Sequence, residues 1–292
     1  MSARLLAQAA VCWSLVTLGV SGQAAPLLVR HNLYESADSD TLNYKGEVLV
    51  LLLEKSKAKY GPYVLQKNMQ QGWSQSRAYS RLEHDELDVM ATMTSVERER
   101  AAIPVRYCLY KGLLGVRIGM GPAQTVQELE SIQTQEQLSR VSVGAVFDWP
   151  DYLIMRDGGL NVVRLGDLPS SFKRLQQASF QLLPLGIVEV GPIARRNQLA
   201  TISSWAIAYP TAYYLFVSKS RPELAERLSY GFEQAIKDKS FDQLFQRRIG
   251  PELNAMGLER RHFFFLKNAK LPPETPLQRK ELWHPAIYGK WP

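Results

Sequence analysis

The residues with the clearest potential for binding chemistry lie together in the segment 87–98. Residues 87–91 are apolar except for Asp88 and predict a strand, and Thr94, Ser95 and Arg98 follow it closely. In open α/β sheets, ligands bind at the carboxyl ends of the strands. A guanidinium at that edge can bind a carboxylate bidentately, while hydroxyls and free helix N–H groups complete the shell. The alternative is a surface helix whose charged residues 97–100 face water.

The familiar catalytic and cofactor motifs are absent from the sequence. It has no Walker A loop, no Gly-x-Gly-x-x-Gly after a strand, no Gly-x-Ser-x-Gly and no His-Glu-x-x-His. The four histidines lack the spacing of metal ligands, and the basic pairs are spread along the chain rather than gathered into a stripe. We therefore expect no metal, no cofactor and no nucleic-acid partner.

The elements that must position the 87–98 segment alternate between strand and helix. Residues 27–31, 63–66 and 87–91 predict strands, with an amphipathic helix over 42–60 between the first two. Residues 113–118 predict a further strand that ends at the glycines of 119–122, and strands over 141–146, 162–163 and 213–217 follow. A Ser cap, an early Pro and Glu223 predict a helix start at 220–223. This alternation favours largely parallel sheets flanked by helices.

The length and the first residues bear on domain organisation and location. The chain has 292 residues and a formal net charge of +7, and a single core rarely exceeds about 250 residues, so two lobes are expected. Residues 1–24 have the charged start, apolar run and small-residue end of a secretory signal, cleaved after Ala24. A transmembrane anchor is the alternative, but the run is short of the ~20 residues that a span needs. Export to a periplasm would leave Cys108 as a single cysteine, predicted to be buried.

On these residues the chain resembles the type II periplasmic solute-binding proteins, the broad family typified by polar amino-acid-binding proteins. Residues 94–98 and the following strand at 103–107 are similar to that family's signature of threonine or serine, two residues and arginine. The resemblance implies an α/β, two-lobed fold in which each lobe is a mainly parallel sheet flanked by helices. It also implies a first lobe over 25–115, a second over 116–210, and a return to the first with a C-terminal tail over 211–292.

The resemblance further implies which residues contact a solute. Arg98 is the matching position for the arginine that clamps an α-carboxylate, with Thr94 and Ser95 as hydroxyl partners and Tyr34 as a wall of the first lobe. Asp148 and Trp149 would supply a polar contact and a wall from the second lobe, although a core role for Trp149 is equally open. Glu189 is a further candidate. The helix start at 44–48 lacks the family's acidic residue for an α-amino group, and Leu185 stands where a branch of the family has arginine.

The function that follows from the resemblance is capture of a small anionic or amino-acid-like solute in the cleft between the lobes. The expected partners are that solute and either an ABC permease or a membrane sensor, and the protein is expected to be a monomer without enzymatic activity. The alternative is an exported lyase of the prephenate or arogenate dehydratase type, which has the same fold. Asp148 or Glu189 would then be the candidate acid.

Overall fold

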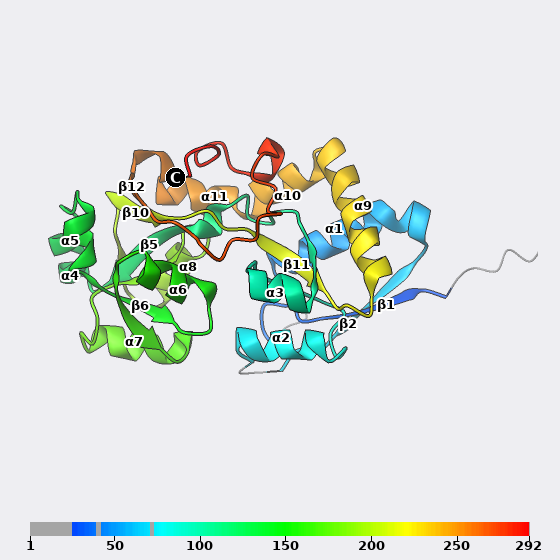
Figure 1. Ribbon diagram of the computed structural model, residues 1–292, viewed down its shortest axis with the longest axis horizontal. Helices are drawn as coiled ribbons and strands as arrows, with labels where there is room; N and C mark the ends of the chain where they lie inside the picture. The colour runs from blue at the N-terminus through cyan, green and yellow to red at the C-terminus, as the bar shows by residue number, and fades with distance from the viewer. Residues whose placement is uncertain (1–24, 39–41, 71–72, 292) are drawn as a thin grey trace, which may run out of the picture.

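The computed structural model describes residues 25–38, 42–70 and 73–291, and its elements form two α/β lobes side by side along the long axis (Figure 1). The predicted signal segment, residues 1–24, lies outside the described residues. None of the helices in the described ranges has the length and apolar character that a membrane span requires.

The first lobe is built on a sheet in which one strand runs against the other four. The strand order is β2-β1-β3-β11-β4, and β11 is antiparallel to both of its neighbours. In Figure 1, α1 and α9 lie above this sheet while α2 lies below it. The strands are β1 (Leu27–His31), β2 (Tyr63–Lys67), β3 (Val89–Met93), β4 (Ile103–Val105) and β11 (Tyr213–Val217); the helices are α1 (Tyr44–Tyr60), α2 (Gln75–Glu83), α3 (Val96–Ala101), α9 (Pro222–Lys237) and α10 (Ser240–Arg248).

The second lobe repeats this arrangement, with β5 as the reversed strand. The strand order is β12-β10-β5-β8, and a parallel bridge from Val143 to Leu182 places the parallel pair β6-β7 beside β8. The strands are β5 (Val116–Gly121), β6 (Ser142–Val146), β7 (Asn161–Leu165), β8 (Leu183–Gly186), β9 (Ala200–Thr201), β10 (Trp205–Ala208) and β12 (His262–Phe265); the helices are α4 (Ala123–Leu129), α5 (Gln135–Ser139), α6 (Pro150–Asp157), α7 (Leu168–Gln176), α8 (Val190–Arg196) and α11 (Gly250–Met256). Both sheets are thus mainly parallel, as predicted.

The strand expected over 113–118 is displaced toward the C-terminus. Residues 113–115 form a short 3-10 turn, η1 (Leu113–Gly115), and β5 continues through both glycines that were expected to end it. A Cβ on Gly119 would lie 2.9 Å from the Leu182 side chain, and one on Gly121 would lie 2.7 Å from the Gln181 carbonyl oxygen. The glycines are therefore there because the neighbouring chain packs closely on the strand, and not because the strand stops.

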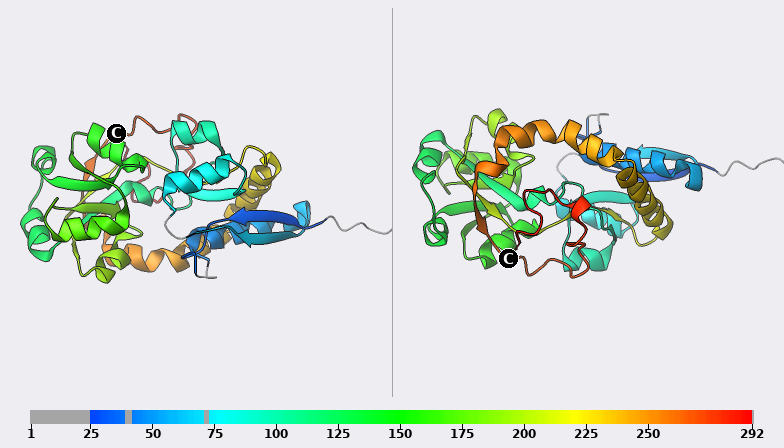
Figure 2. Two further views of the ribbon diagram at one scale, coloured as in Figure 1. Left: turned by 90° about the horizontal axis from the view of Figure 1, so that it is seen from below. Right: turned by 90° about the horizontal axis from the view of Figure 1, so that it is seen from above.

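The C-terminal part of the chain crosses between the lobes again, which the sequence analysis did not anticipate. Within the stretch 211–292, β12 pairs in parallel with β10 of the second lobe. Figure 2 shows α10 and α11 running along one side of the molecule from the first lobe to the second before β12 is reached. The tail then returns to the first lobe, where the Lys270 carbonyl accepts from the Val96 N–H at 3.3 Å. The tail therefore contacts both lobes.

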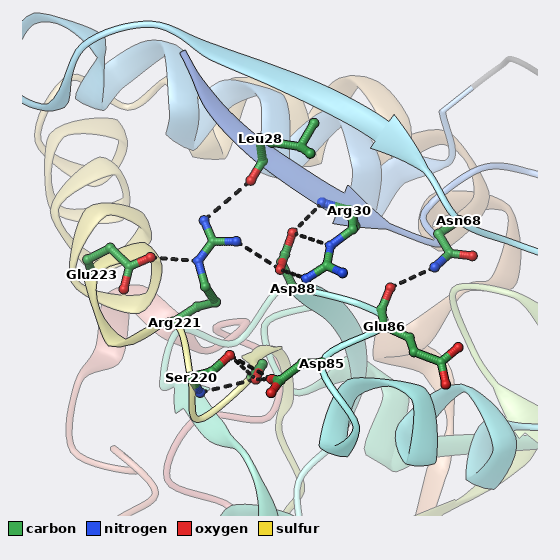
Figure 3. Close-up of polar contacts among 10 residues, drawn as sticks. Leu28, Arg30, Asn68, Asp85, Glu86, Asp88, Ser220, Arg221 and Glu223 are labelled. Carbon is green, nitrogen blue, oxygen red and sulfur yellow. Dashed lines mark hydrogen bonds and ion pairs between the residues drawn. The ribbon is translucent and has the colours of Figure 1, made fainter. Parts of the chain in front are cut away.

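A buried carboxylate joins three elements of the first lobe. Asp88 accepts hydrogen bonds from the Arg30 backbone N–H (2.7 Å), Nε (3.1 Å) and Nη2 (2.6 Å), and Arg221 Nη1 lies 2.9 Å from it (Figure 3). Burial opposes the charge, but the hydrogen bonds from Arg30 and the charge of Arg221 outweigh it and lower the pKa of Asp88. Asp88 thereby holds β1, the start of β3 and the start of α9 together.

Candidate functional site

Arg98 lies in the first turn of α3, and its guanidinium turns back toward the carboxyl end of β3. Nη1 donates to Thr92 Oγ1 at 2.5 Å and to the Met93 carbonyl at 2.9 Å, while Nη2 lies 3.3 Å from Gln75 Oε1. The group also lies over the Tyr79 ring, 5.9 Å from its centroid. The side chain is thus held at the sheet edge where the sequence predicted an anion site.

The charge of Arg98 has no carboxylate partner among the described residues. All of its hydrogen-bond acceptors are neutral oxygens, and the ion pairs of the described chain do not include it. Burial lowers the pKa of this guanidinium, while its electrostatic interactions with Tyr213, Tyr79 and two aspartates act in the opposite direction. An added anion would stabilise this cation, because the guanidinium is largely desolvated and all of its acceptors are neutral.

The two hydroxyls expected beside Arg98 have other roles in the structure. Thr94 Oγ1 donates to Glu99 Oε1 at 2.6 Å, and Ser95 caps α3 by accepting from the Arg98 backbone N–H at 3.2 Å. Thr92, two residues before Thr94 along the chain, is the threonine that contacts the guanidinium. The alternation of side chains along a strand could have indicated Thr92 as well as Thr94.

Asp148 brings the second lobe into contact with this site. Its backbone carbonyl lies 3.4 Å from Arg98 Nη2. Its carboxylate accepts from the backbone N–H and the hydroxyl of Ser76, at 3.3 and 3.1 Å, in the first turn of α2. The loop after β6 therefore meets the helix N-terminus of the first lobe, and the structure is closed at this point.

Two cavities flank the first turn of α2. One, of about 520 Å³, lies on the first lobe and includes Asn32 and Glu35 in its wall. The other, of about 450 Å³, lies between the lobes and includes Asp148 and Trp149. Gln75, which accepts from Arg98, belongs to both walls. Trp149 also packs against the core, and its role as a wall for a solute stays a prediction.

Tyr34 stacks on a buried histidine of the first lobe. Its ring centroid lies 5.1 Å from that of His31 with an interplanar angle of 16°, and Lys67 Nζ lies 4.9 Å from the Tyr34 centroid. His31 is 0% exposed, and its Nδ1 accepts from the Leu33 N–H at 3.2 Å. Burial lowers the pKa of His31 to about 4. The neutral imidazole thus supports the loop whose residues Asn32 and Glu35 line the first cavity.

This burial predicts a pH-dependent stability. The folded-state pKa of His31 lies below the unfolded value of about 6.5, so the unfolded chain binds the proton more readily and stability falls as pH drops from about 6.5 to 4. We expect the His31→Asn variant, which keeps an acceptor, to lose about 3 kcal/mol less over this interval than the wild type does. Urea unfolding at stepped pH measures this. A slope that is unchanged in His31→Asn would contradict the assignment.

Glu189, a candidate from the sequence, lies beside a group of buried polar residues of the second lobe that sequence reasoning did not assign. Its Oε1 accepts from the Gly186 N–H at 3.1 Å and lies 3.7 Å from Arg117 Nη1. Arg117 is buried, forms an ion pair with Asp151 and donates from Nε to the Tyr209 hydroxyl at 2.9 Å. The position of Arg117 inside the apolar run 113–120 could have indicated this buried group, because a buried charge requires a partner.

Lys45, in the first turn of α1, is a second residue that sequence reasoning did not assign. Its Nζ lies 5.8 Å from the centroid of the Tyr213 ring, and burial lowers its pKa while the charge of Glu189 raises it. Tyr213 donates to the Ala91 carbonyl of β3 at 3.0 Å and contacts Tyr110 edge-on. Lys45 thus lies on the first lobe and is influenced by the charge of Glu189, which belongs to the second lobe.

Comparison with known proteins gives similarity in structure alone. No protein-family model matches the chain, and no curated protein resembles it in sequence. An arginine-specific periplasmic binding protein from Salmonella typhimurium has a TM-score of 0.57 at 12% identity, over 76% of this chain and 99% of that one. A periplasmic His/Glu/Gln/Arg/opine family-binding protein from Silicibacter pomeroyi, in complex with lysine, has a TM-score of 0.59 at 10% identity, over 76% and 97%.

A third similar structure is described as an ancestral amino-acid-binding protein that preceded cyclohexadienyl dehydratase. Its TM-score is 0.53 at 11% identity, over 77% of this chain and 95% of that one. At such identities the likeness establishes the fold. The chain has the two-lobed α/β fold of these periplasmic binding proteins, which confirms the predicted fold class and the resemblance at the level of structure.

Proposed function

We propose that this protein is a periplasmic solute-binding protein that captures a small anionic or amino-acid-like solute between its lobes. The carrying observation is Arg98, a largely buried cation at the carboxyl end of β3 that has only neutral acceptors among the described residues. A carboxylate of the solute would supply its missing counter-charge and form charge-assisted hydrogen bonds. The similar structures, which are themselves amino-acid-binding proteins, support a binding role.

Closure of the two lobes fits this proposal. The first lobe comprises 25–115 and the return after 211, and the second comprises 116–210 and β12. They are joined where β5 and β11 begin and also where the C-terminal chain crosses to β12 and back, and rotation about these crossings would open the cleft. In the closed structure Asp148 meets Ser76 and the Asp148 carbonyl meets Arg98. A closed, solute-bound form would then be recognised by an ABC permease or by a membrane sensor. Export through residues 1–24 remains part of the proposal.

A thermal-shift screen of residues 25–292 against amino acids, organic acids, amines and short peptides tests the proposal. A solute at ~100 times its dissociation constant adds about 2.7 kcal/mol and raises the melting temperature by several degrees. We expect Arg98→Ala to weaken the binding about 100-fold or more, because a desolvated charge partner is lost. Arg100→Ala is the matched control, since Arg100 is exposed on the same helix.

Two results would count against this reading. Unchanged affinity in Arg98→Ala would remove Arg98 from the site. Turnover of prephenate or arogenate by the purified protein would instead support the dehydratase alternative, for which the third similar structure is the motivating observation.

A further inference from the structure

Lys45 is poorly placed for a residue with a purely structural role. It lies in the first turn of α1, where the helix dipole disfavours a positive charge. The ion pairs and hydrogen bonds of the described residues give it no partner, and Tyr213 is its ring contact at 5.8 Å. The nearby Glu47 of the same turn is engaged by Arg248, whose Nε lies 3.3 Å from Glu47 Oε1. The ammonium of Lys45 is therefore uncompensated within its own lobe.

The carboxylates of the second lobe form no ion pair with Lys45 among the described residues either. Glu189 acts on Lys45 through its charge, but its closest cation is Arg117 at 3.7 Å. Asp151 is paired with Arg117, and the Asp148 carboxylate is bound by Ser76. Buried or partly buried charges are normally paired, so a second cation without an ion-pair partner requires explanation.

Lys45 and Arg98 both lie on the first lobe and are linked through Tyr213. Tyr213 connects them, because its ring lies beside Lys45 and its hydroxyl binds the Ala91 carbonyl of β3, the strand that leads to Arg98. The charge of Arg98 also acts on Tyr213. The first lobe thus carries two cations linked through one aromatic residue, and both lack a carboxylate partner in the described part of the chain.

We infer that the solute carries two anionic groups, one bound by Arg98 and the other by Lys45. This inference rests on the proposed function and narrows the class of solute to dianionic compounds, such as dicarboxylates with or without an amino group. A monoanion would pair with one cation and leave the other uncompensated. Each anionic group therefore adds its own ion pair, and specificity follows from the loss of one pair when either group is neutral.

Titration calorimetry with matched acid and amide pairs tests the inference. The probes are L-glutamate against L-glutamine and glutarate against glutaramate, which differ in one charge at nearly constant shape. We expect the acid of at least one pair to bind about tenfold or more tightly than its amide. In Lys45→Met this preference should fall to about twofold or less, while Arg98→Ala should weaken both members. Lys57→Met, exposed on the same helix, should keep the wild-type preference.

The outcomes separate this inference from the proposed function. If an amide binds as tightly as its acid and both depend on Arg98, the second anionic group is overturned and solute binding is retained. If neither acid binds while another amino acid or amine binds through Arg98, the dianionic class is again overturned. A preference for the acid that persists in Lys45→Met would also overturn the role of Lys45.

Discussion

Replacement of Asp88 by alanine is expected to lower the free energy of unfolding by about 3–5 kcal/mol, because it leaves two arginines near a buried site without their carboxylate. Asp88 is 0% exposed, and Arg30 and Arg221 both bind it at hydrogen-bond distance (Figure 3). Urea unfolding of wild type and variant measures the difference. Asp157→Ala is the control, since the Asp157 side chain is 52% exposed beside Arg156 and its loss should cost less than about 0.5 kcal/mol.

The sign of the pH dependence gives this prediction a second readout. The folded-state pKa of Asp88 is lowered, so its contribution is present above the unfolded value of about 4 and is lost as pH falls through the folded value. The Asp88→Asn variant, which retains the size of the side chain, should therefore lose less stability below pH 4 than the wild type. A cost of less than about 1 kcal/mol in both variants would mean that the two arginines find other acceptors.

Replacement of Trp283 by alanine is expected to lower the free energy of unfolding by about 3–5 kcal/mol, because loss of a large buried side chain leaves a cavity. This site is independent of Asp88. Trp283 is 2% exposed and its Nε1 donates to the Pro276 carbonyl at 2.9 Å. It packs on Gly112, where the chain passes from the first lobe to the second, so the C-terminal tail is fastened to that crossing. Chemical unfolding measures the cost, and Tyr288→Ala, at a more exposed position of the same tail, is the control.

A double-mutant cycle with Gly112 tests the contact itself. Gly112 has φ +78°, and a Cβ there would lie 2.5 Å from the Trp283 ring. Gly112→Ala should therefore cost the left-handed backbone penalty of about 1–2 kcal/mol together with the steric clash. In the Trp283→Ala background this cost should fall, and the backbone penalty and the close approach of the Cβ to Ile287 Cδ1, at 2.9 Å, should remain. Equal costs in both backgrounds would show that Trp283 does not press on this glycine.

The sequence by itself is sufficient to predict the class of fold and to identify one residue of the candidate site. Hydrophobic periodicity is a local property, so the alternation of strands and helices, and with it two mainly parallel sheets, can be read directly from the chain. Arg98 is likewise identified by its neighbours, because it follows the end of a strand within a few residues. The helix start predicted at 220–223 shows the limit of such local reasoning: the position of the helix was right, but its cap was not. Helix α9 begins at Pro222, yet Ser220 binds Asp85 at 2.6 Å and does not cap the helix.

The tertiary structure alone decided which polar groups meet across the chain. Lys45 reaches Tyr213, Arg117 reaches Asp151 and Tyr209, and Asp148 reaches Ser76. In the same way, β12 pairs with a strand of the second lobe and Trp283 packs on Gly112, which is distant in the sequence. Each pairing depends on strand register and on how the two lobes close, and no local pattern encodes either. Hydrophobic periodicity determines which face of an element is buried, whereas the partner of a buried charge is set by chain segments many residues away.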